Sequence, residues 1–368
     1  MKKNLLVFVG VTIVFALATS FLLGDTEGIP TLGGWGGVLS LLTLLLNIAI
    51  ALVIAVMLHE FGHILGALFM GNRVTHLIFG PFLFSFSPFH LEWKWKQAYF
   101  FGAMKAEVAA YEDERTFASS IRAQRVISSA GPTFSLLLGL LALKLSSDFL
   151  SLWGLIGLLS VAIGIGTLFT DGTNALLLGR RNYSLFFAWN ALITASAMDV
   201  RKLDFLLKDS RRYLYEVAER NDTKWSKDLH NLNVLYFYTA MQGERNHEDI
   251  LVTRLIKNLV EFWQEIRTTP LHQNTVAMIL SEEVIRLKEV SDHRGADILL
   301  HLLLNKQVLD PLSLLKVEAF THCSDERADS YLSYIRSMYS PLHPYGALLS
   351  FEEQRLKTLE QGRLLNKS

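Results

Sequence analysis

Four long apolar stretches place the strongest constraint on how this chain can fold. A helix needs about 20 residues to cross the ~30 Å hydrocarbon core of a membrane, and each stretch is close to that length or longer. They cover approximately residues 5–23, 38–70, 126–145 and 150–178. The sequence therefore predicts a polytopic membrane protein of mainly α fold, with about four transmembrane helices.

Residues 182–368 have a different character, because charged side chains recur throughout them. We therefore expect two domains, a transmembrane domain over residues 1–181 and an all-α cytoplasmic domain over residues 182–368. Amphipathic helical patterns in the second domain fit either helical-hairpin repeats or a plain helical bundle. These patterns cover residues 201–220, 228–241, 250–266 and 325–338.

Composition excludes several classes of protein. Only 19% of the residues are charged, where soluble proteins average about a quarter, and the net charge is zero. Nothing in this charge balance suggests a nucleic-acid partner. A single cysteine, Cys323, excludes an internal disulfide framework and any cysteine-rich metal site.

The distribution of Lys and Arg predicts the orientation of the spans. The first apolar stretch is too long for the core of a signal peptide and no small-residue cleavage site follows it, so we read it as a retained span. Basic residues lie at the N-terminus, in residues 73–125 and at Arg180-Arg181, whereas residues 24–37 have none. Because cytoplasmic loops carry the excess of positive charge, we expect the N-terminus and the C-terminal domain to be cytoplasmic.

The loop between the second and third spans has the alternation of a β segment. In residues 74–108, aromatic residues such as Phe82, Phe84 and Phe86 recur with a period near two, and proline and glycine punctuate the run. This pattern predicts short strands that form hairpins. The aromatic residues also fit a belt at the membrane interface, and strands lying on the membrane surface would combine the two readings.

The second span contains the sequence His59-Glu60-Phe61-Gly62-His63. Residues four apart share one face of an α-helix, so His59 and His63 can bind one metal ion, with Glu60 close enough to act as a base on a metal-bound water. Zinc suits two imidazoles and one carboxylate with a fourth position left for water. The alternative is a pair of core histidines bonded to polar neighbours, but ionisable groups deep in a membrane are costly and usually functional.

A third ligand is expected from the last span, where Asp171 is followed by Gly172. Asp171 lies about nine residues from the basic edge at Arg180, and His63 lies ten residues from Arg73. At ~1.5 Å per helical residue, both side chains are roughly 14–15 Å from the same membrane edge. Equal depth permits a shared metal ion. The alternative is an Asp-Gly turn at the surface of the bilayer. We also expect Gly164, Gly166 and this Asp-Gly pair to interrupt the helix.

Residues 38–180 resemble the site-2 protease family of intramembrane metalloproteases. The similarity rests on H-E-F-G-H in one span, Gly131-Pro132 in the next and Thr170-Asp171-Gly172 in the last, with Phe101-Gly102-Ala103-Met104-Lys105 resembling the family's membrane-associated β segment. The resemblance implies one zinc ion per chain, held by His59, His63 and Asp171, with Glu60 as general base and acid. It also implies single-span membrane proteins as substrates, bound as unwound strands.

The chain departs from the family pattern at two places. Ser135 stands where the family usually has an asparagine after Gly-Pro, and Ile163 and Gly166 stand where an asparagine and a proline often precede Asp-Gly. These differences concern the positioning of substrate and leave the metal ligands in place. Asn174, one turn after Asp171, is a candidate replacement for the missing amide, or else a satisfied polar residue at the membrane edge. The candidate substrate-positioning residues are Gly131, Pro132, Ser135 and Asn174.

These features together predict an intramembrane zinc metalloendopeptidase, which cuts a membrane-protein or membrane-bound peptide substrate in or near its transmembrane segment with zinc-activated water. The expected partners are that substrate, the lipid bilayer and a protein bound by the cytoplasmic helices. One alternative is an inactive membrane scaffold with a vestigial or structural zinc site. A second is a small transporter that uses the broken fourth helix as its binding site.

Overall fold

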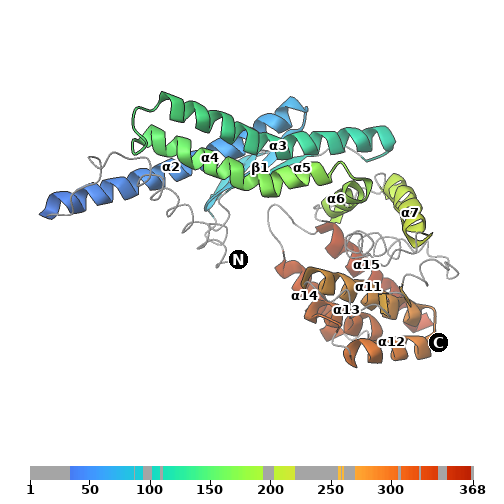
Figure 1. The fold of residues 1–368 in the computed structure, drawn as a ribbon. Helices are drawn as coiled ribbons and strands as arrows, with labels where there is room; N and C mark the ends of the chain where they lie inside the picture. The colour runs from blue at the N-terminus through green and yellow to red at the C-terminus, as the bar shows by residue number, and fades with distance from the viewer. Residues whose placement is uncertain are drawn as a thin grey trace. The chain divides into compact units, whose positions relative to one another are not determined.

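The computed structural model of the chain separates into two compact units, one formed by residues 1–109 and 117–179, the other by residues 110–116 and 180–368 (Figure 1). Each unit is described by itself. The predicted first span at residues 5–23, the predicted helix at 228–241 and most of that at 250–266 lie outside the described residues. The structure describes residues 34–86, 88–93, 102–107, 111–193, 203–219, 256–257, 259–260, 270–305, 308–322, 325–338 and 346–365.

Long apolar helices dominate the first unit. Helix α2 is formed by Gly34–Phe69 and helix α3 by Glu114–Leu145, while the third rod joins α4 (Leu152–Thr167), the π-helical turn η3 (Leu168–Gly172) and α5 (Thr173–Leu177). Within the described residues, these are three helices long and apolar enough to cross a membrane. They match the second, third and fourth predicted spans.

Helix α3 begins well before residue 126, where the apolar run starts. Asp113 and Thr116 account for the early start, because the Asp113 carboxylate accepts the Thr116 amide at 2.7 Å and the Thr116 hydroxyl accepts the Asp113 amide at 3.0 Å. This reciprocal pair satisfies amide groups that the first turn of a helix leaves free. A polar first section therefore precedes the membrane-length part of the helix.

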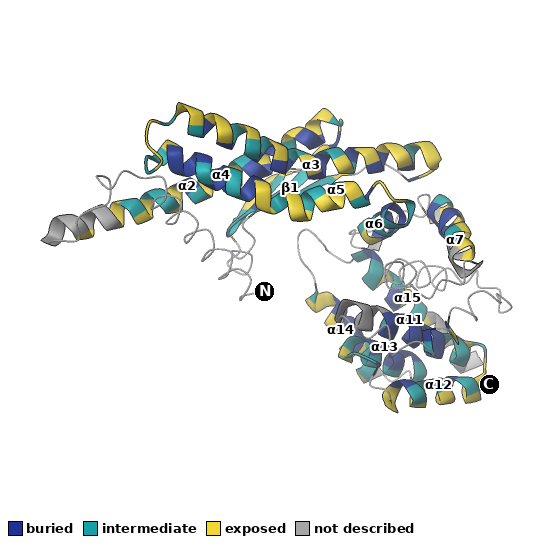
Figure 2. Cartoon of the chain, viewed as in Figure 1, coloured by how far each residue is buried: buried dark blue, intermediate teal, exposed yellow. Residues whose placement is uncertain are grey.

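Helices α2 and α4 pack through small and branched apolar side chains. Ala51, Ala55 and Val56 of α2 form one buried cluster with Leu155, Ile156, Leu159 and Ile163 of α4. Many residues on the outward faces of these helices are exposed (Figure 2). They include large apolar residues, as expected for surfaces that contact lipid rather than water. Examples of these exposed residues are Leu45, Val53, Met57, Phe61, Leu137 and Leu141.

Helix α3 lies unusually close to α2 beside the histidines. A Cβ atom added to Gly62 would lie 2.7 Å from Cβ of Phe134, and one added to Gly66 would lie 2.7 Å from Cβ of Ala130. Both distances are shorter than real side chains allow. Gly62 and Gly66 thus form a small-xxx-small pair, which lets two helix backbones approach each other within a membrane.

The loop after α2 forms a four-stranded antiparallel sheet, as the alternation of aromatic residues predicted. Its order is β3-β2-β1-β4, with a bulge between Val74 and His76, and Gly80 adopts φ 53° between the first two strands. Trp95, Tyr99 and Phe100 lie outside the described residues. The strand order makes β3 and β4 the two edge strands among the described strands. The strands are β1 (Arg73–Phe79), β2 (Phe82–Phe86), β3 (Phe89–Trp93) and β4 (Ala103–Glu107).

The prediction that Gly164 and Gly166 interrupt the last span is wrong. Gly164 and Gly166 lie within regular helix α4, and the irregularity is the π-helical turn that contains Asp171 and Gly172. Gly164 instead serves close packing, because an added Cβ would lie 2.8 Å from Cγ of Leu136 on α3. Gly164 therefore allows α4 to pack closely against α3 and does not break the helix.

Helices form all the described regular structure of the second unit. The predicted helices at 201–220 and 325–338 correspond to α7 (Leu203–Glu219) and α14 (Asp325–Ser337). The core between α11, α13, α14 and α15 contains Ile285, Phe320 and Tyr331. A buried ion network lies beside it, in which Lys316 contacts both Glu282 and Glu352 and Arg355 contacts Glu282. The helices are α6 (Arg181–Ile193), α7 (Leu203–Glu219), α11 (Pro270–Glu289), α12 (His293–Asn305), α13 (Pro311–His322), α14 (Asp325–Ser337) and α15 (Gly346–Leu365).

Candidate metal centre

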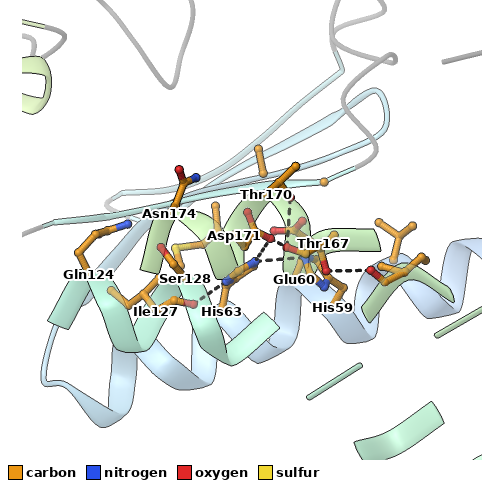
Figure 3. Close-up of a pocket in the computed structure, with 15 residues that line it drawn as sticks. His59, Glu60, His63, Gln124, Ile127, Ser128, Thr167, Thr170, Asp171 and Asn174 are labelled. Carbon is orange, nitrogen blue, oxygen red and sulfur yellow. Dashed lines mark hydrogen bonds and ion pairs between the residues drawn. The ribbon is translucent and has the colours of Figure 1, made fainter. Parts of the chain in front are cut away.

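The side chains of His59, His63 and Asp171 point toward one another between α2 and the π-helical turn η3 (Figure 3). The Nε2 atoms of the two histidines lie 3.2 Å apart. Oδ2 of Asp171 lies 3.3 Å from Nε2 of His59 and 3.5 Å from Nε2 of His63. The structure thus brings three predicted ligands from two separate apolar helices to one point.

The other ring nitrogens of the histidines face helix α3. Nδ1 of His63 donates to the carbonyl oxygen of Ile127 at 2.7 Å, because a carbonyl can only accept. Nδ1 of His59 lies 3.1 Å from the hydroxyl oxygen of Ser135. In the neutral ring of His63 the Nε2 atom consequently has a free lone pair, directed at the same point as the carboxylate of Asp171. Lone pairs that converge in this way require a shared proton or a cation between them.

The geometry of these three atoms fits zinc. Zinc takes nitrogen and carboxylate oxygen ligands at roughly 2.0–2.1 Å in a tetrahedral arrangement, which separates two ligand atoms by about 3.3 Å. The three observed separations are 3.2, 3.3 and 3.5 Å. Within the described part of the chain, these side chains form the cluster of histidine and acidic groups that could hold a metal ion. The donor set and its spacing therefore match the predicted cofactor.

Glu60 lies next to this cluster and is almost entirely buried. Its Oε2 atom has no hydrogen-bond partner among the described residues, although it is shielded from solvent. A buried carboxylate oxygen without a partner is costly, so its position calls for a ligand, a water molecule or a nearby cation. Gly102, just before strand β4, approaches the carboxylate so closely that an added Cβ would overlap with Oε1. The sheet therefore reaches the acidic side chain predicted to be the base.

Glu60 and the three candidate ligands line one cavity of about 460 Å³. Part of its wall is the start of β4, with Gly102, Ala103 and Met104, and another part is the polar side of α3. The cavity is large enough to admit a short stretch of polypeptide beside the candidate ligands. Its polar lining also gives water a place next to Glu60.

The π-helical turn sets the direction of the Asp171 side chain. Widening the helix between Leu168 and Gly172 changes the rotation of the residues that follow α4. Hydroxyl groups bond back to the backbone there, with Thr167 Oγ1 donating to the Ile163 carbonyl at 2.8 Å and Thr170 Oγ1 donating to the Thr167 carbonyl at 3.2 Å. Single π-helical turns inside α-helices are frequent at functional sites.

The candidate substrate-positioning residues occupy two different places. Asn174 lines the cavity, whereas Gly131, Pro132 and Ser135 do not contribute to its described lining and lie on α3. Gly131 packs directly against the imidazole of His63, where an added Cβ would overlap with the ring. The structure therefore places the Gly-Pro region of α3 against the histidine rings and outside the described lining of the cavity.

Sequence reasoning missed several residues of this site. Gln124 and Ser128 of α3 and Thr167 and Thr170 near Asp171 also line the cavity. The spacing of four between Gln124 and Ser128 was a readable signal, because it places two polar groups on one face of α3 where its apolar part begins. The carbonyl of Ile127 gave no signal, since a backbone acceptor is the same at every residue.

Comparison with known protein families supports the resemblance to site-2 proteases. The family model described as Peptidase family M50 matches residues 47–322, which include the two histidines, Glu60 and Asp171. No curated protein and no solved structure matches the chain. The family match covers most of the sequence and confirms the resemblance to site-2 proteases. With its apolar helices and its His-His-Asp cluster, this chain belongs to peptidase family M50, the site-2 protease family of membrane metalloproteases.

Proposed function

We propose that the chain is an intramembrane zinc metalloendopeptidase, which hydrolyses peptide bonds in or near the transmembrane segment of a membrane-protein or membrane-bound peptide substrate. The observation that carries this proposal is the convergence of His59, His63 and Asp171 next to Glu60, between helices long enough to cross a membrane. Membership of peptidase family M50 supports the same reaction class.

The candidate ligands and Glu60 have separate roles in the proposed reaction. A zinc ion held by His59, His63 and Asp171 would polarise the scissile carbonyl and make water nucleophilic near neutral pH. Glu60 accepts a proton from the attacking water and delivers it to the leaving amine. Oε2 of Glu60 is buried at the wall of the cavity and has no hydrogen-bond partner in the part of the chain that the structure describes, which suits this proton transfer.

The number of protein ligands favours catalysis over a structural zinc site. Structural zinc sites are closed by four protein ligands, whereas catalytic sites keep one position for water or substrate. Among the residues that the structure describes, the cluster offers three donors. The alternative of an inactive scaffold with structural zinc has no fourth donor there to support it.

Strand β4 is the proposed docking edge for substrate. A transmembrane helix hides its amides in internal hydrogen bonds, so the substrate must become extended before it can be cut. Strand β4 pairs with β1 on one side, and its first residues line the cavity that contains Glu60. An extended peptide added to β4 on the side that faces away from β1 would gain main-chain hydrogen bonds beside the base.

Proline scanning can test this docking mode. Proline removes an amide donor and blocks pairing, so a scan through residues 103–106 should reduce cleavage at the positions whose amides face away from β1. The same scan through β3, the opposite edge, is the matched control. Cleavage that persists throughout the β4 scan, or that falls equally in the β3 scan, would eliminate the docking mode and leave the proposed chemistry intact.

The proposed topology follows the charge distribution of the chain. The transmembrane domain comprises residues 1–181 with several spans, its N-terminus is cytoplasmic, and residues 182–368 form a cytoplasmic helical domain. We assign this helical domain to binding a protein partner that regulates the protease or delivers substrate. Reporter fusions at the N-terminus and after residue 181 would test the orientation.

Three variants of the full-length protein test the proposed chemistry. Glu60→Gln should retain zinc and lose cleavage, because the amide cannot accept the proton. His59→Ala and Asp171→Ala should lose both zinc and cleavage. Zinc content is measured by elemental analysis of purified protein, and cleavage by loss of a full-length single-span substrate in membranes. A Glu60→Gln variant that cuts at the wild-type rate would refute the role of this residue, and wild-type protein without zinc would refute the metalloprotease.

A further inference from the structure

We propose that Ser135 is a positioning residue for the metal centre, whose hydroxyl accepts a hydrogen bond from Nδ1–H of His59 and thereby directs Nε2 of that ring toward His63 and Asp171. This inference rests on the proposed zinc site. It assigns Ser135 a role different from the substrate contact that its place in the motif suggests.

Ser135 lies directly behind the ring of His59 on helix α3. Its side chain is 0% exposed, and its hydroxyl oxygen is 3.1 Å from Nδ1 of His59. Ser135 does not contribute to the described lining of the cavity, whereas His59 does. The imidazole therefore separates this hydroxyl from the space that a substrate would enter.

The two histidines are held by the same face of α3. Ile127, Gly131 and Ser135 are spaced four residues apart, so they lie in one row along the helix. Ile127 accepts a hydrogen bond from Nδ1 of His63, Gly131 leaves room for the His63 ring, and Ser135 meets Nδ1 of His59. One row of α3 thus contacts both imidazoles on the side away from Asp171.

The direction of the hydrogen bond follows from what lies on the other side of the ring. Nε2 of His59 faces Nε2 of His63 and the carboxylate of Asp171, so it must have a free lone pair to bind a metal ion. A neutral imidazole with a free Nε2 has its proton on Nδ1. Nδ1 then donates, and the Ser135 hydroxyl accepts.

Loss of the hydroxyl should weaken metal binding in a defined way. Without an acceptor, a buried Nδ1–H of His59 is left unpaired, and the tautomer with the proton on Nε2 becomes more populated. That tautomer has no lone pair on Nε2, so it cannot bind the metal ion through the atom that faces His63 and Asp171. Removal of such outer partners of metal-binding histidines typically costs 10–100-fold in metal affinity or activity.

The test compares zinc affinity among variants of the full-length protein in detergent, measured by competition with a chromogenic chelator. Ser135→Ala should bind zinc about 10–100-fold more weakly than the wild type. Ser135→Thr keeps a hydroxyl acceptor and should retain much of the affinity. Ser160→Ala is the matched control, because Ser160 of α4 is also 0% exposed and its hydroxyl has no hydrogen-bond partner among the residues that the structure describes. This control should bind zinc like the wild type.

Activity at high zinc separates positioning of the ligand from binding of substrate. Excess zinc should restore kcat of Ser135→Ala with KM unchanged, because the variant lacks only metal affinity. Zinc affinity of Ser135→Ala equal to that of the wild type would overturn the inference. Equal loss in Ser135→Ala and Ser135→Thr would also overturn it, since packing would then be the cause. Wild-type protein that binds no zinc would instead refute the proposed metalloprotease itself.

Discussion

Replacing Gly131 with alanine should displace the His63 imidazole and disable the metal centre. The Cβ atom of the alanine would lie 2.5 Å from Cε1 and 2.8 Å from Cδ2 of this ring, with Nε2 nearer still. Ordinary contacts of a Cβ atom begin at 3.4 Å. The ring must therefore move by about 1 Å, or α3 must move away from α2 by as much.

Neither movement is easily accommodated. The His63 ring is held by its bond to the Ile127 carbonyl at 2.7 Å and by its contacts with His59 and Asp171. Separation of the helices is opposed by the close packing at Gly62. Misplacement of a reacting group by ~1 Å can cost about 100-fold in rate, which corresponds to roughly 2.7 kcal/mol of activation free energy. We expect Gly131→Ala to reduce cleavage by about this factor and to bind zinc more weakly.

Gly166→Ala provides the matched control, because within the described part of the chain no atom outside the backbone of α4 lies within 4 Å of the Cβ atom that it adds. The assay measures cleavage of a single-span substrate by purified full-length protein, together with its zinc content. Gly166→Ala should behave like the wild type. Full zinc binding and cleavage in Gly131→Ala would refute the steric argument. Equal losses in both variants would point instead to a need for helix flexibility.

Three further predictions follow from other contacts. Gly102→Ala should retain zinc but reduce cleavage at least tenfold, because its Cβ would displace the Glu60 carboxylate; zinc analysis and a cleavage assay check this. Lys316→Met should lower the free energy of unfolding of the second unit by roughly 3–5 kcal/mol, since it leaves buried Glu282 and Glu352 without this cation; denaturant unfolding of the full-length protein measures the loss. Burial alone would raise the pKa of Glu282, but Lys316 and Arg355 outweigh it and lower the pKa to about 2, below the ordinary 4.5. The stabilisation that ionised Glu282 gives the second unit should therefore be complete above about pH 4.5 and disappear as the pH falls toward 2. The unfolding midpoint should fall over the same pH range.

Matched variants separate these effects from general damage. Lys288→Met removes a lysine whose partner, Asp297, is largely exposed, so it should change the free energy of unfolding by less than about 1 kcal/mol. A Lys316→Met variant as stable as Lys288→Met would contradict the buried-network argument. Gly102→Ala with full activity would show that the Glu60 carboxylate can move without loss of function. Stability that does not change between pH 5 and pH 3 would contradict the low pKa of Glu282.

Much of the membrane unit could be predicted because its signals are local. Apolar length gave the three described spans, and the spacing of four placed His59 and His63 on one helix face. Counting residues from the basic edges placed Asp171 at the same depth as His63, and the structure brings the three side chains together. Alternation of aromatic residues indicated the sheet. Each of these features follows from helix rise, helix rotation or strand pleating, which are properties of the chain over a few residues.

Tertiary structure decided the features that orient those side chains. The partners of the two Nδ1 atoms, Ile127 and Ser135, lie 64 and 76 residues away from their histidines. They meet only because glycines let α2 and α3 approach closely. The approach of Gly102 to Glu60 likewise joins residues that are far apart in the sequence. Residue spacing within a helix fixes which side chains share a face, whereas the hydrogen bonds that orient them depend on how separate elements pack.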